Sequence, residues 1–180
     1  MISLLGECLS RPVSLTKIVI TGNKGGTGKT TIAALLAEYL TYQKKKVNLI
    51  DTAGVSGGSE IYLKRADLML VPFIPHYVDL QVIIPWYNSL SWQDKQKVYF
   101  LPNRYQKTKE QQEGLAQLLN ETGRDMEVGV ILPPLSHRPA LYGSVLNGSK
   151  ENFFTKKDSE PAKKVFQELL NHYAKNKKSN

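Results

Sequence analysis

The stretch from Thr21 to Thr31 constrains the fold of this chain more than any other. It reads Thr-Gly-Asn-Lys-Gly-Gly-Thr-Gly-Lys-Thr-Thr. It follows a short apolar run, Lys17 to Ile20, and it precedes Ile32 to Tyr42, where apolar residues recur at helical spacing. A strand, a glycine-rich loop and then a helix is the order that a phosphate-binding loop requires. An ordinary turn before a core helix is the alternative, and it does not explain why Gly-Lys-Thr-Thr stands at this place.

The residues of this loop match the chemistry of a triphosphate. Glycines let the backbone curl until successive N–H groups point into one concavity, and the following helix directs its positive end to the same place. Lys29 can reach the outer phosphates, and the Thr30 hydroxyl can ligate Mg²⁺. We therefore expect the phosphate contacts to come from Gly25, Gly26, Thr27, Gly28, Lys29, Thr30 and Thr31.

Length and composition indicate one globular domain. A chain of 180 residues with 41% hydrophobic residues can bury a proper core, so we expect a single domain over 1–180, with 1–15 as a lead-in and 175–180 as a polar basic tail. No apolar run approaches the roughly 18 residues that span a bilayer. The single cysteine, Cys8, excludes an internal disulfide and a paired-cysteine metal site. We expect a cytoplasmic protein.

The net charge of +8 favours a polyanionic partner. Basic residues gather toward the end of the chain, at Lys156, Lys157, Lys163, Lys164, Lys175, Lys177 and Lys178. DNA is the first interpretation, because such a surface attracts it without reading its sequence. An anionic membrane surface and a solvated tail that only maintains solubility are the alternatives.

Apolar runs alternate with helical patterns along the whole chain, which predicts an α/β fold with a doubly wound, mostly parallel sheet flanked by helices. The expected strands are 17–21, 47–51, 67–73, 97–101 and 127–132. The first expected helix starts within the loop and runs to about Tyr42. The other expected helices are 59–65, 78–90, 107–121, 138–146 and 161–174, with Pro85 predicted to kink or split the helix over 78–90.

The loop carries an extra lysine, Lys24, near its start. With this residue the motif Gly-Asn-Lys-Gly-Gly-Thr-Gly-Lys-Thr resembles the deviant Walker A motif of the ParA/MinD family of P-loop ATPases. The resemblance implies ATP as the ligand and an ATP-dependent homodimer, in which Lys24 neutralises charge on the partner's nucleotide as an arginine finger does. The alternative is a solvated loop lysine.

Asp51 ends the second expected strand, at the edge of the sheet where ligands bind in such folds. It can hold Mg²⁺ through a water, and Gly54 could offer its N–H to the γ-phosphate. The segments Ile50–Gly54, Arg65–Phe73 and Asp79–Leu80 resemble the Walker B region of plasmid-type ParA ATPases. A turn residue at a strand end is the alternative for Asp51.

The spacing around Asp51 departs from the family. Asp51 comes only 22 residues after Lys29, which is the spacing of the family's separate Walker A′ strand, yet its surroundings resemble Walker B. Whether Asp51 corresponds to Walker B or to A′ stays open. In the first case the A′ carboxylate, which helps to orient the attacking water in the family, has no match, because the position two residues further is Ala53. We then expect weak ATP hydrolysis, since positioning the nucleophile is a large part of this chemistry.

The end of the fourth strand is a candidate base-binding site. Leu101–Tyr105 resembles the Asn-Arg segment near the adenine in ParA and MinD proteins, and the Asn103 amide offers a donor and an acceptor together. Pro134 could form a wall beside the base. A structural Asn at a strand end is the alternative.

The resemblance implies a plasmid-partition or positioning ATPase that forms an ATP-dependent dimer, binds DNA non-specifically and responds to a ParB-like or other activating partner. The competing hypothesis is a nucleotide-binding scaffold with little or no hydrolysis that engages a protein. A GTP-binding relative is disfavoured, because the chain lacks an Asn/Thr-Lys-x-Asp guanine motif. We do not expect membrane binding, because the apolar stripe of the last helix suits packing on the sheet.

Overall fold

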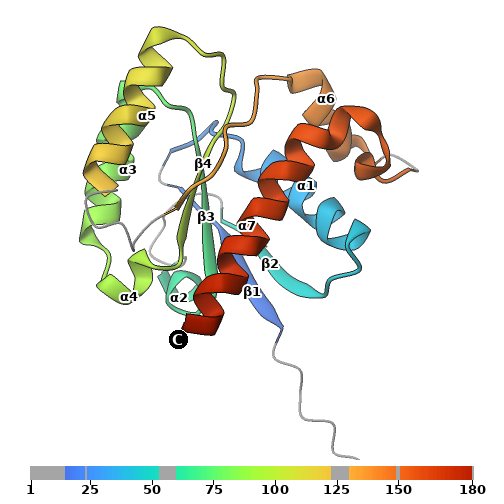
Figure 1. Ribbon diagram of the computed structural model, residues 1–180, viewed down its shortest axis with the longest axis horizontal. Helices are drawn as coiled ribbons and strands as arrows, with labels where there is room; N and C mark the ends of the chain where they lie inside the picture. Colours follow the sequence, from blue (N-terminus) through green and yellow to red (C-terminus); the bar gives the residue numbers. More distant parts are fainter. Residues whose placement is uncertain (1–14, 23, 53–59, 123–129, 149–150, 180) are drawn as a thin grey trace, which may run out of the picture.

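A five-stranded, entirely parallel sheet forms the centre of the protein (Figure 1). The computed structural model describes residues 15–22, 24–52, 60–122, 130–148 and 151–179. The strand order is β2-β1-β3-β4-β5, so the sheet confirms the predicted fold class. The strands are β1 (Thr16–Ile20), β2 (Val47–Asp51), β3 (Leu68–Phe73), β4 (Val98–Pro102) and β5 (Val130–Ile131).

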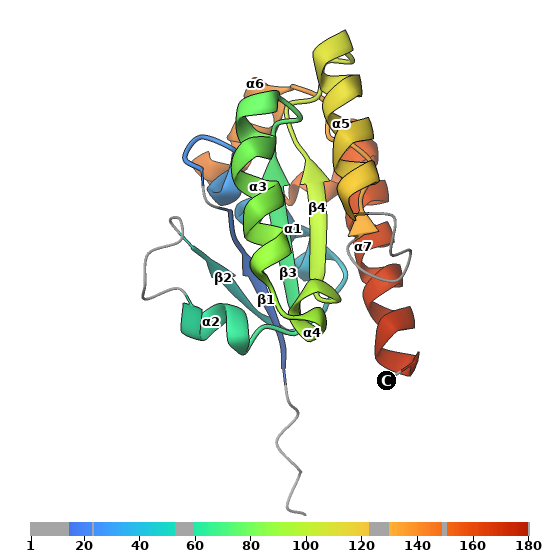
Figure 2. The ribbon, with the colours of Figure 1, turned by 90° about the vertical axis from the view of Figure 1, so that its left-hand side faces the viewer.

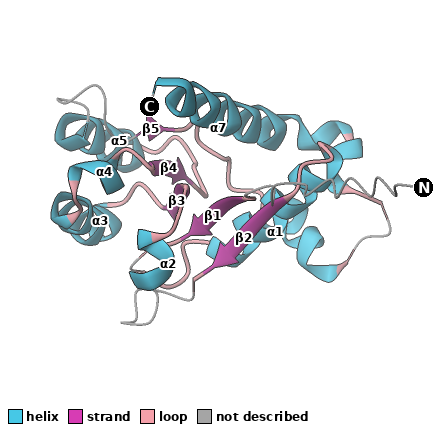
Figure 3. Cartoon of the chain, turned by 90° about the horizontal axis from the view of Figure 1, so that it is seen from below, coloured by secondary structure: helices cyan, strands magenta, loops and turns pink. Residues whose placement is uncertain are grey.

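Helices cover both faces of the sheet, as Figure 3 shows from below. One face carries α1 (Lys29–Tyr42), α6 (Pro139–Gly143) and α7 (Glu160–Ser179). The other carries α2 (Glu60–Lys64), α3 (Tyr77–Ser89), α4 (Trp92–Lys95) and α5 (Lys109–Thr122), which face the viewer in Figure 2. Three short 3₁₀ helices join α6 to α7: η1 (Ser144–Asn147), η2 (Phe153–Thr155) and η3 (Lys157–Ser159). Among the described helices, none has the length and hydropathy to cross a membrane.

The strands are apolar because both of their faces are buried. Successive side chains of a strand point to opposite faces. Ile18 and Ile20 accordingly join the core beneath α1 and α7, whereas Val19 joins the core beneath α3 and α5. The predicted stripes of α1 and α7 also lie in the first core. Phe166 of α7 is fully buried there, beside an aromatic cluster that includes Tyr39 and Phe154.

Three predicted boundaries differ from the structure. Helix α7 continues through Ser179, so the residues expected as a tail form its last turns; the Asn176 Nδ2 donates to the Tyr99 hydroxyl at 3.2 Å and ties this end to β4. Pro85 lies inside α3, which is one unbroken element and is not split. The helix expected over 138–146 is divided into α6 and η1.

The order of strands places a topological switch between β1 and β3. From β1 the chain passes through α1 to β2 on one side, and from β3 it passes through α3 to β4 on the other. Connections that leave two neighbouring strands in opposite directions open a crevice at the carboxyl edge of the sheet, where ligands bind in such folds. The glycine-rich loop follows β1 at this edge.

Candidate functional site

The loop between β1 and α1 has the backbone conformation that its glycines predict. Gly26 and Gly28 have φ values of 77° and 90°, in the left-handed region that favours glycine. A side chain at Gly28 would also be crowded, because a Cβ there would lie 2.4 Å from the Asn103 Nδ2. The same amide nitrogen donates to the Thr27 carbonyl oxygen at 2.9 Å, so β4 holds the loop in place.

The first turn of α1 presents free backbone N–H groups to the loop. Gly28 is the N-cap of this 14-residue helix, and no side chain of the described part of the chain caps it. Gly25 and Gly26 are exposed, and nothing within 4 Å fills the space that a Cβ would take at either residue. An uncapped helix N-terminus behind an open glycine loop is suited to an anion.

Lys29 turns back into the loop. Its side chain is 8% exposed, and its Nζ donates to the carbonyl oxygen of Lys24 at 2.8 Å. The ammonium group therefore lies within the curl of the loop, where a phosphate group would face it. Thr31 follows in the half-buried first turn of α1.

Thr30 and Asp51 come together across the edge of the sheet. The Thr30 hydroxyl donates to Asp51 Oδ2 at 2.8 Å, and both residues are exposed. Strand β2 pairs directly with β1, with Asp51 in register with Ile20. Thr52 adds two bonds to the same place, because its N–H and its hydroxyl both donate to the Ile20 carbonyl at 3.0 Å. The structure thus joins the two residues expected to hold Mg²⁺.

Lys24 lies on the rim of the loop and contacts a carboxylate of its own chain. Its Nζ donates to Asp79 Oδ1. Asp79 stands in the first turn of α3, directly across the switch between β1 and β3, and is 2% exposed. No role was predicted for Asp79 from the sequence. The sequence did hold a signal for this contact. A carboxylate stands in the first turn of the helix that follows the buried strand β3, and the loop carries one lysine more than phosphate binding requires.

Asn103 has a contact with the loop that the sequence did not predict. It is buried, and its amide nitrogen bonds the loop, which makes it a support of the loop as well as a candidate neighbour of the base. The nitrogen has a second hydrogen, so this bond leaves donor capacity. The segment with Pro134 does lie beside it, because the Leu135 N–H donates to the Pro102 carbonyl at 2.8 Å. Pro134 is exposed. Gly54 lies outside the described residues.

The donor set fits a magnesium-bound triphosphate. A hydroxyl and a carboxylate are the oxygen ligands that Mg²⁺ takes beside phosphate oxygens and water. The Thr27 hydroxyl is buried in the loop and has no hydrogen-bond partner among the described residues, so a polar ligand would satisfy it. Among the described residues, no three His, Cys, Asp or Glu side chains gather into a metal cluster. The ion would therefore depend on Thr30, Asp51 and the phosphates.

Comparisons with known proteins identify a family and similar folds. The family model described as the CobQ/CobB/MinD/ParA nucleotide-binding domain matches residues 18–176. The fold resembles that of a Borrelia burgdorferi B31 protein assigned to plasmid partition and bound to AMPPNP, with a TM-score of 0.60, 13% identity, and 87% of this chain and 99% of that chain covered. It also resembles a Cyanothece McdA variant in complex with ATP, with a TM-score of 0.63, 11% identity, and 89% and 96% covered. No curated protein sequence matches significantly.

Proposed function

Since the chain belongs to the CobQ/CobB/MinD/ParA family of nucleotide-binding domains, we propose that it is a ParA-like partition or positioning ATPase. In this proposal ATP and Mg²⁺ bind at the loop, and two ATP-bound subunits form a dimer that binds DNA without sequence preference. A ParB-like or other protein partner resets the dimer. Similarity to nucleotide-bound relatives supports the ligand, and the other steps follow from the family resemblance.

One observation carries the proposal: the Thr30 hydroxyl contacts Asp51 at the first turn of α1, where Lys29 turns back into the glycine loop. We assign the outer phosphates to Lys29 and to the N–H groups of 25–31, and the metal to Thr30 and Asp51. Bound Mg²⁺ would neutralise charge on the phosphate oxygens. Lys24 would serve the nucleotide of the second subunit.

We infer weak hydrolysis from the position of Asp51. Its contact with Thr30 and the direct pairing of β2 with β1 favour the role of the Walker B carboxylate. The family's A′ carboxylate then has no match, because Ala53 takes the corresponding place in the sequence. Without a group that orients the attacking water, ATP can bind and organise the protein while turnover stays slow.

The same observation favours a second candidate function, a nucleotide-binding scaffold that engages a protein partner and hydrolyses little ATP. Both functions include ATP-dependent dimerisation. They differ in one result, because a partition ATPase should hydrolyse ATP faster when its activating partner and DNA are present, and a scaffold should not.

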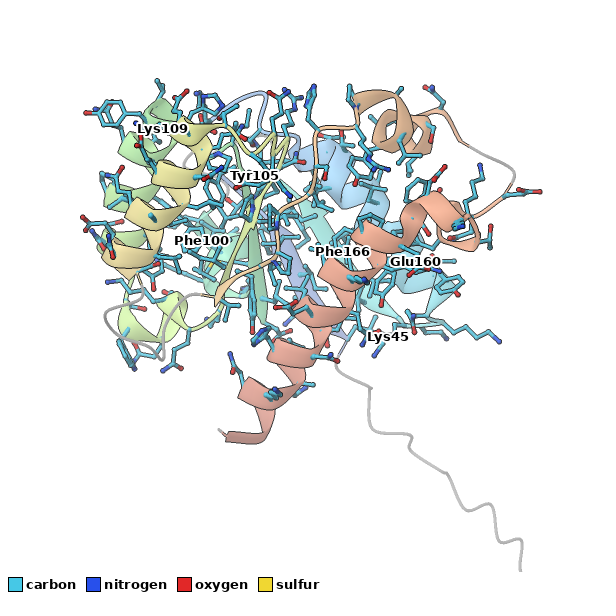
Figure 4. The ribbon with its side chains drawn as sticks, turned by 45° about the horizontal axis from the view of Figure 1, so that its top comes forward. Lys45, Phe100, Tyr105, Lys109, Glu160 and Phe166 are labelled. Carbon is cyan, nitrogen blue, oxygen red and sulfur yellow. The ribbon has the colours of Figure 1, made fainter. Side chains whose placement is uncertain are left out.

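Exposed lysines supply a surface for DNA. Lys44, Lys45 and Lys46 follow α1, and the start of α7 lies beside them, because the Lys163 Nζ is 5.3 Å from the centre of the Tyr42 ring. Figure 4 shows the labelled Lys45 and Glu160 on this side of the molecule. Lys156, Lys157 and Lys164 are exposed near the same helix start. We propose this lysine surface as the region that meets DNA, in a protein of the cytoplasm.

Calorimetric titration with ATP and Mg²⁺ tests the nucleotide site, and sedimentation velocity with and without ATP tests the dimer. We expect heat of binding, and a doubling of mass with ATP only. DNA retardation should occur with ATP at low salt, and affinity should fall by orders of magnitude between 50 and 200 mM salt. Absence of binding heat, together with an unchanged melting temperature, would refute ATP binding and with it the whole proposal.

A further inference from the structure

Asp79 is a buried carboxylate whose charge has two partners among the described residues. Its Oδ2 accepts a hydrogen bond from the Ile74 N–H at 2.9 Å, and its Oδ1 accepts from the Lys24 Nζ. The side chain of Asp79 is 2% exposed, whereas that of Lys24 is 41% exposed. A carboxylate removed from water requires compensation by an opposite charge or by hydrogen bonds. Lys24 supplies the charge.

The contact crosses the switch point of the sheet. Lys24 belongs to the loop after β1, and Asp79 belongs to the first turn of the helix that follows β3, 55 residues further along the chain. The Asp79 backbone is fixed, because its N–H and that of Leu80 donate to the His76 carbonyl at 3.0 and 3.1 Å. The carboxylate is therefore the stationary member of the pair, and the lysine on the loop is the member that can move.

The two positions of Lys24 compete with each other. A lysine held by Asp79 of its own subunit does not extend to a second subunit. When the lysine leaves, the buried carboxylate keeps, among the described residues, only the Ile74 N–H as a partner, and this loss of compensation costs free energy. Since each subunit carries the same pair, a symmetric dimer that uses both lysines would open the contact twice.

We propose that Asp79 is a positioning residue that holds Lys24 within its own subunit, and that this contact must open before Lys24 reaches the nucleotide of a partner. The inference rests on the proposed ATP-dependent dimer. The Lys24–Asp79 pair then opposes dimerisation of the nucleotide-free protein, and triphosphate on the partner must outcompete Asp79 for the lysine. The pair would set the ATP and protein concentrations at which the dimer forms.

Removing the charge of Asp79 should make dimerisation easier. Asp79→Asn keeps the size of the side chain and an oxygen for the Ile74 N–H, but it weakens the attraction for Lys24. We expect half-maximal dimerisation with ATP and Mg²⁺ at about tenfold lower protein concentration, in line with the strength of a charge-assisted hydrogen bond. Structural damage would weaken dimerisation, so a gain distinguishes positioning from a general role in folding.

A matched control is available on the same face of the protein. Asp94→Asn removes the carboxylate of the Asp94–Lys97 pair, whose members are 2.9 Å apart, without touching the loop. It should leave the dimerisation midpoint unchanged. Lys24→Gln should abolish the gain when combined with Asp79→Asn, because the lysine itself is then missing. If Asp79→Asn does not fold, Asp79→Ser, which also removes the charge, takes its place.

A measurement on the wild-type protein needs no substitution at Asp79. In the nucleotide-free state, an amine-acetylating reagent should modify Lys24 at least about fivefold more slowly than Lys109. The carboxylate that holds Lys24 is buried, whereas Lys109 is 91% exposed and its partner Glu113 is 67% exposed at 3.7 Å, so only the first ion pair should protect its amine. Equal rates would overturn the proposal, and so would an Asp79→Asn dimer that forms at the wild-type concentration or higher. If wild-type protein never dimerises with ATP, the proposed function fails instead, and the acetylation result separates the two failures.

Discussion

The Thr30 hydroxyl donates to Asp51 Oδ2 over 2.8 Å, which joins the start of α1 to the end of β2. The contact exists because β2 is the direct neighbour of β1, in a register that pairs Ile20 with Asp51. A threonine at the loop and a carboxylate one strand away are the two protein oxygens that a phosphate-bound Mg²⁺ needs. This relationship favours the Walker B interpretation of Asp51 that the sequence left open.

Asp51→Asn should remove most of the Mg²⁺ dependence of ATP binding. The amide keeps the shape of the side chain but loses the negative charge that the ion requires, so we expect affinity for Mg-ATP to fall about 10- to 100-fold. Affinity measured with EDTA should change little. Titration calorimetry of the variant and of Asp158→Asn, which alters an exposed carboxylate, would check this. If Asp51→Asn keeps the wild-type ratio between the ATP affinity with Mg²⁺ and the ATP affinity with EDTA, Asp51 is not a metal ligand.

Lys29→Ala should abolish the thermal stabilisation that ATP confers. A ligand at 100 times its dissociation constant stabilises the folded state by about 2.7 kcal/mol, and that shift disappears when the phosphate contacts are lost. The matched control is Lys109→Ala, which removes a lysine from the solvent-exposed face of α5 and should keep the shift. Differential scanning fluorimetry over an ATP series measures both. A normal shift in Lys29→Ala would contradict our assignment of the phosphate site.

Gly28→Ala should destabilise the protein by about 2 kcal/mol or more. The residue has φ of 90°, which costs a side chain about 1–2 kcal/mol, and the added methyl would meet the Asn103 amide at 2.4 Å. Gly25→Ala is the matched control in the same loop, because its Cβ meets nothing within 4 Å. In urea unfolding, Gly28→Ala combined with Asn103→Ala should be less destabilised than the sum of the single variants. Strict additivity would show that the close approach does not matter.

Charge reversal on the lysine surface should weaken DNA binding. Lys45→Glu with Lys46→Glu changes two exposed charges beside the start of α7, and we expect at least a tenfold loss of affinity and a shallower dependence on salt. Lys64→Glu with Lys95→Glu makes the same change in net charge on the α2 and α4 side. Gel retardation with ATP compares the pairs. Equal losses in both would indicate that only net charge matters.

Tyr99→Phe should flatten the loss of stability at alkaline pH. Burial raises the pKa of Tyr99 to about 12, although the hydrogen bond from Asn176 acts in the opposite direction. An unfolded tyrosine titrates near 10. The unfolded state therefore loses its proton first, so the stability that Tyr99 contributes is complete below about pH 10 and declines as pH rises toward 12.

The wild-type free energy of unfolding should consequently fall more steeply than that of Tyr99→Phe over this range, by up to about 1.4 kcal/mol per pH unit. Urea unfolding at several alkaline pH values gives the slopes. Tyr62→Phe changes a ring that is 48% exposed and serves as the control. If the free energy of unfolding falls equally steeply with pH in wild type and in Tyr99→Phe, burial does not raise the pKa of Tyr99.

The elements of the fold could be predicted from short stretches of sequence. Both faces of β3 are buried, and an uninterrupted apolar run in the sequence predicts this. Helix α1 buries one stripe, and apolar residues at a period of 3.6 predict that stripe. The left-handed glycines of the loop followed from its motif. Of the two outcomes predicted for Pro85, a kink or a split, the split is wrong, because α3 is one element. The prediction also failed at the end of α7, where Asn176 packs against Tyr99 in a helix that the polar composition did not predict.

The sequence by itself determined that a strand, a loop with left-handed glycines and a helix follow one another, because backbone freedom, side-chain period and helix polarity are properties of consecutive residues. Only the tertiary structure decided that Thr30 meets Asp51, that Lys24 meets Asp79 and that Asn103 holds Thr27. These contacts depend on which strands are neighbours. Lys24 and Asp79 are 55 residues apart, and Thr27 and Asn103 are 76 apart. They come together because β1 lies between β2 and β3, and β4 lies beyond β3. The packing of the whole chain sets this order.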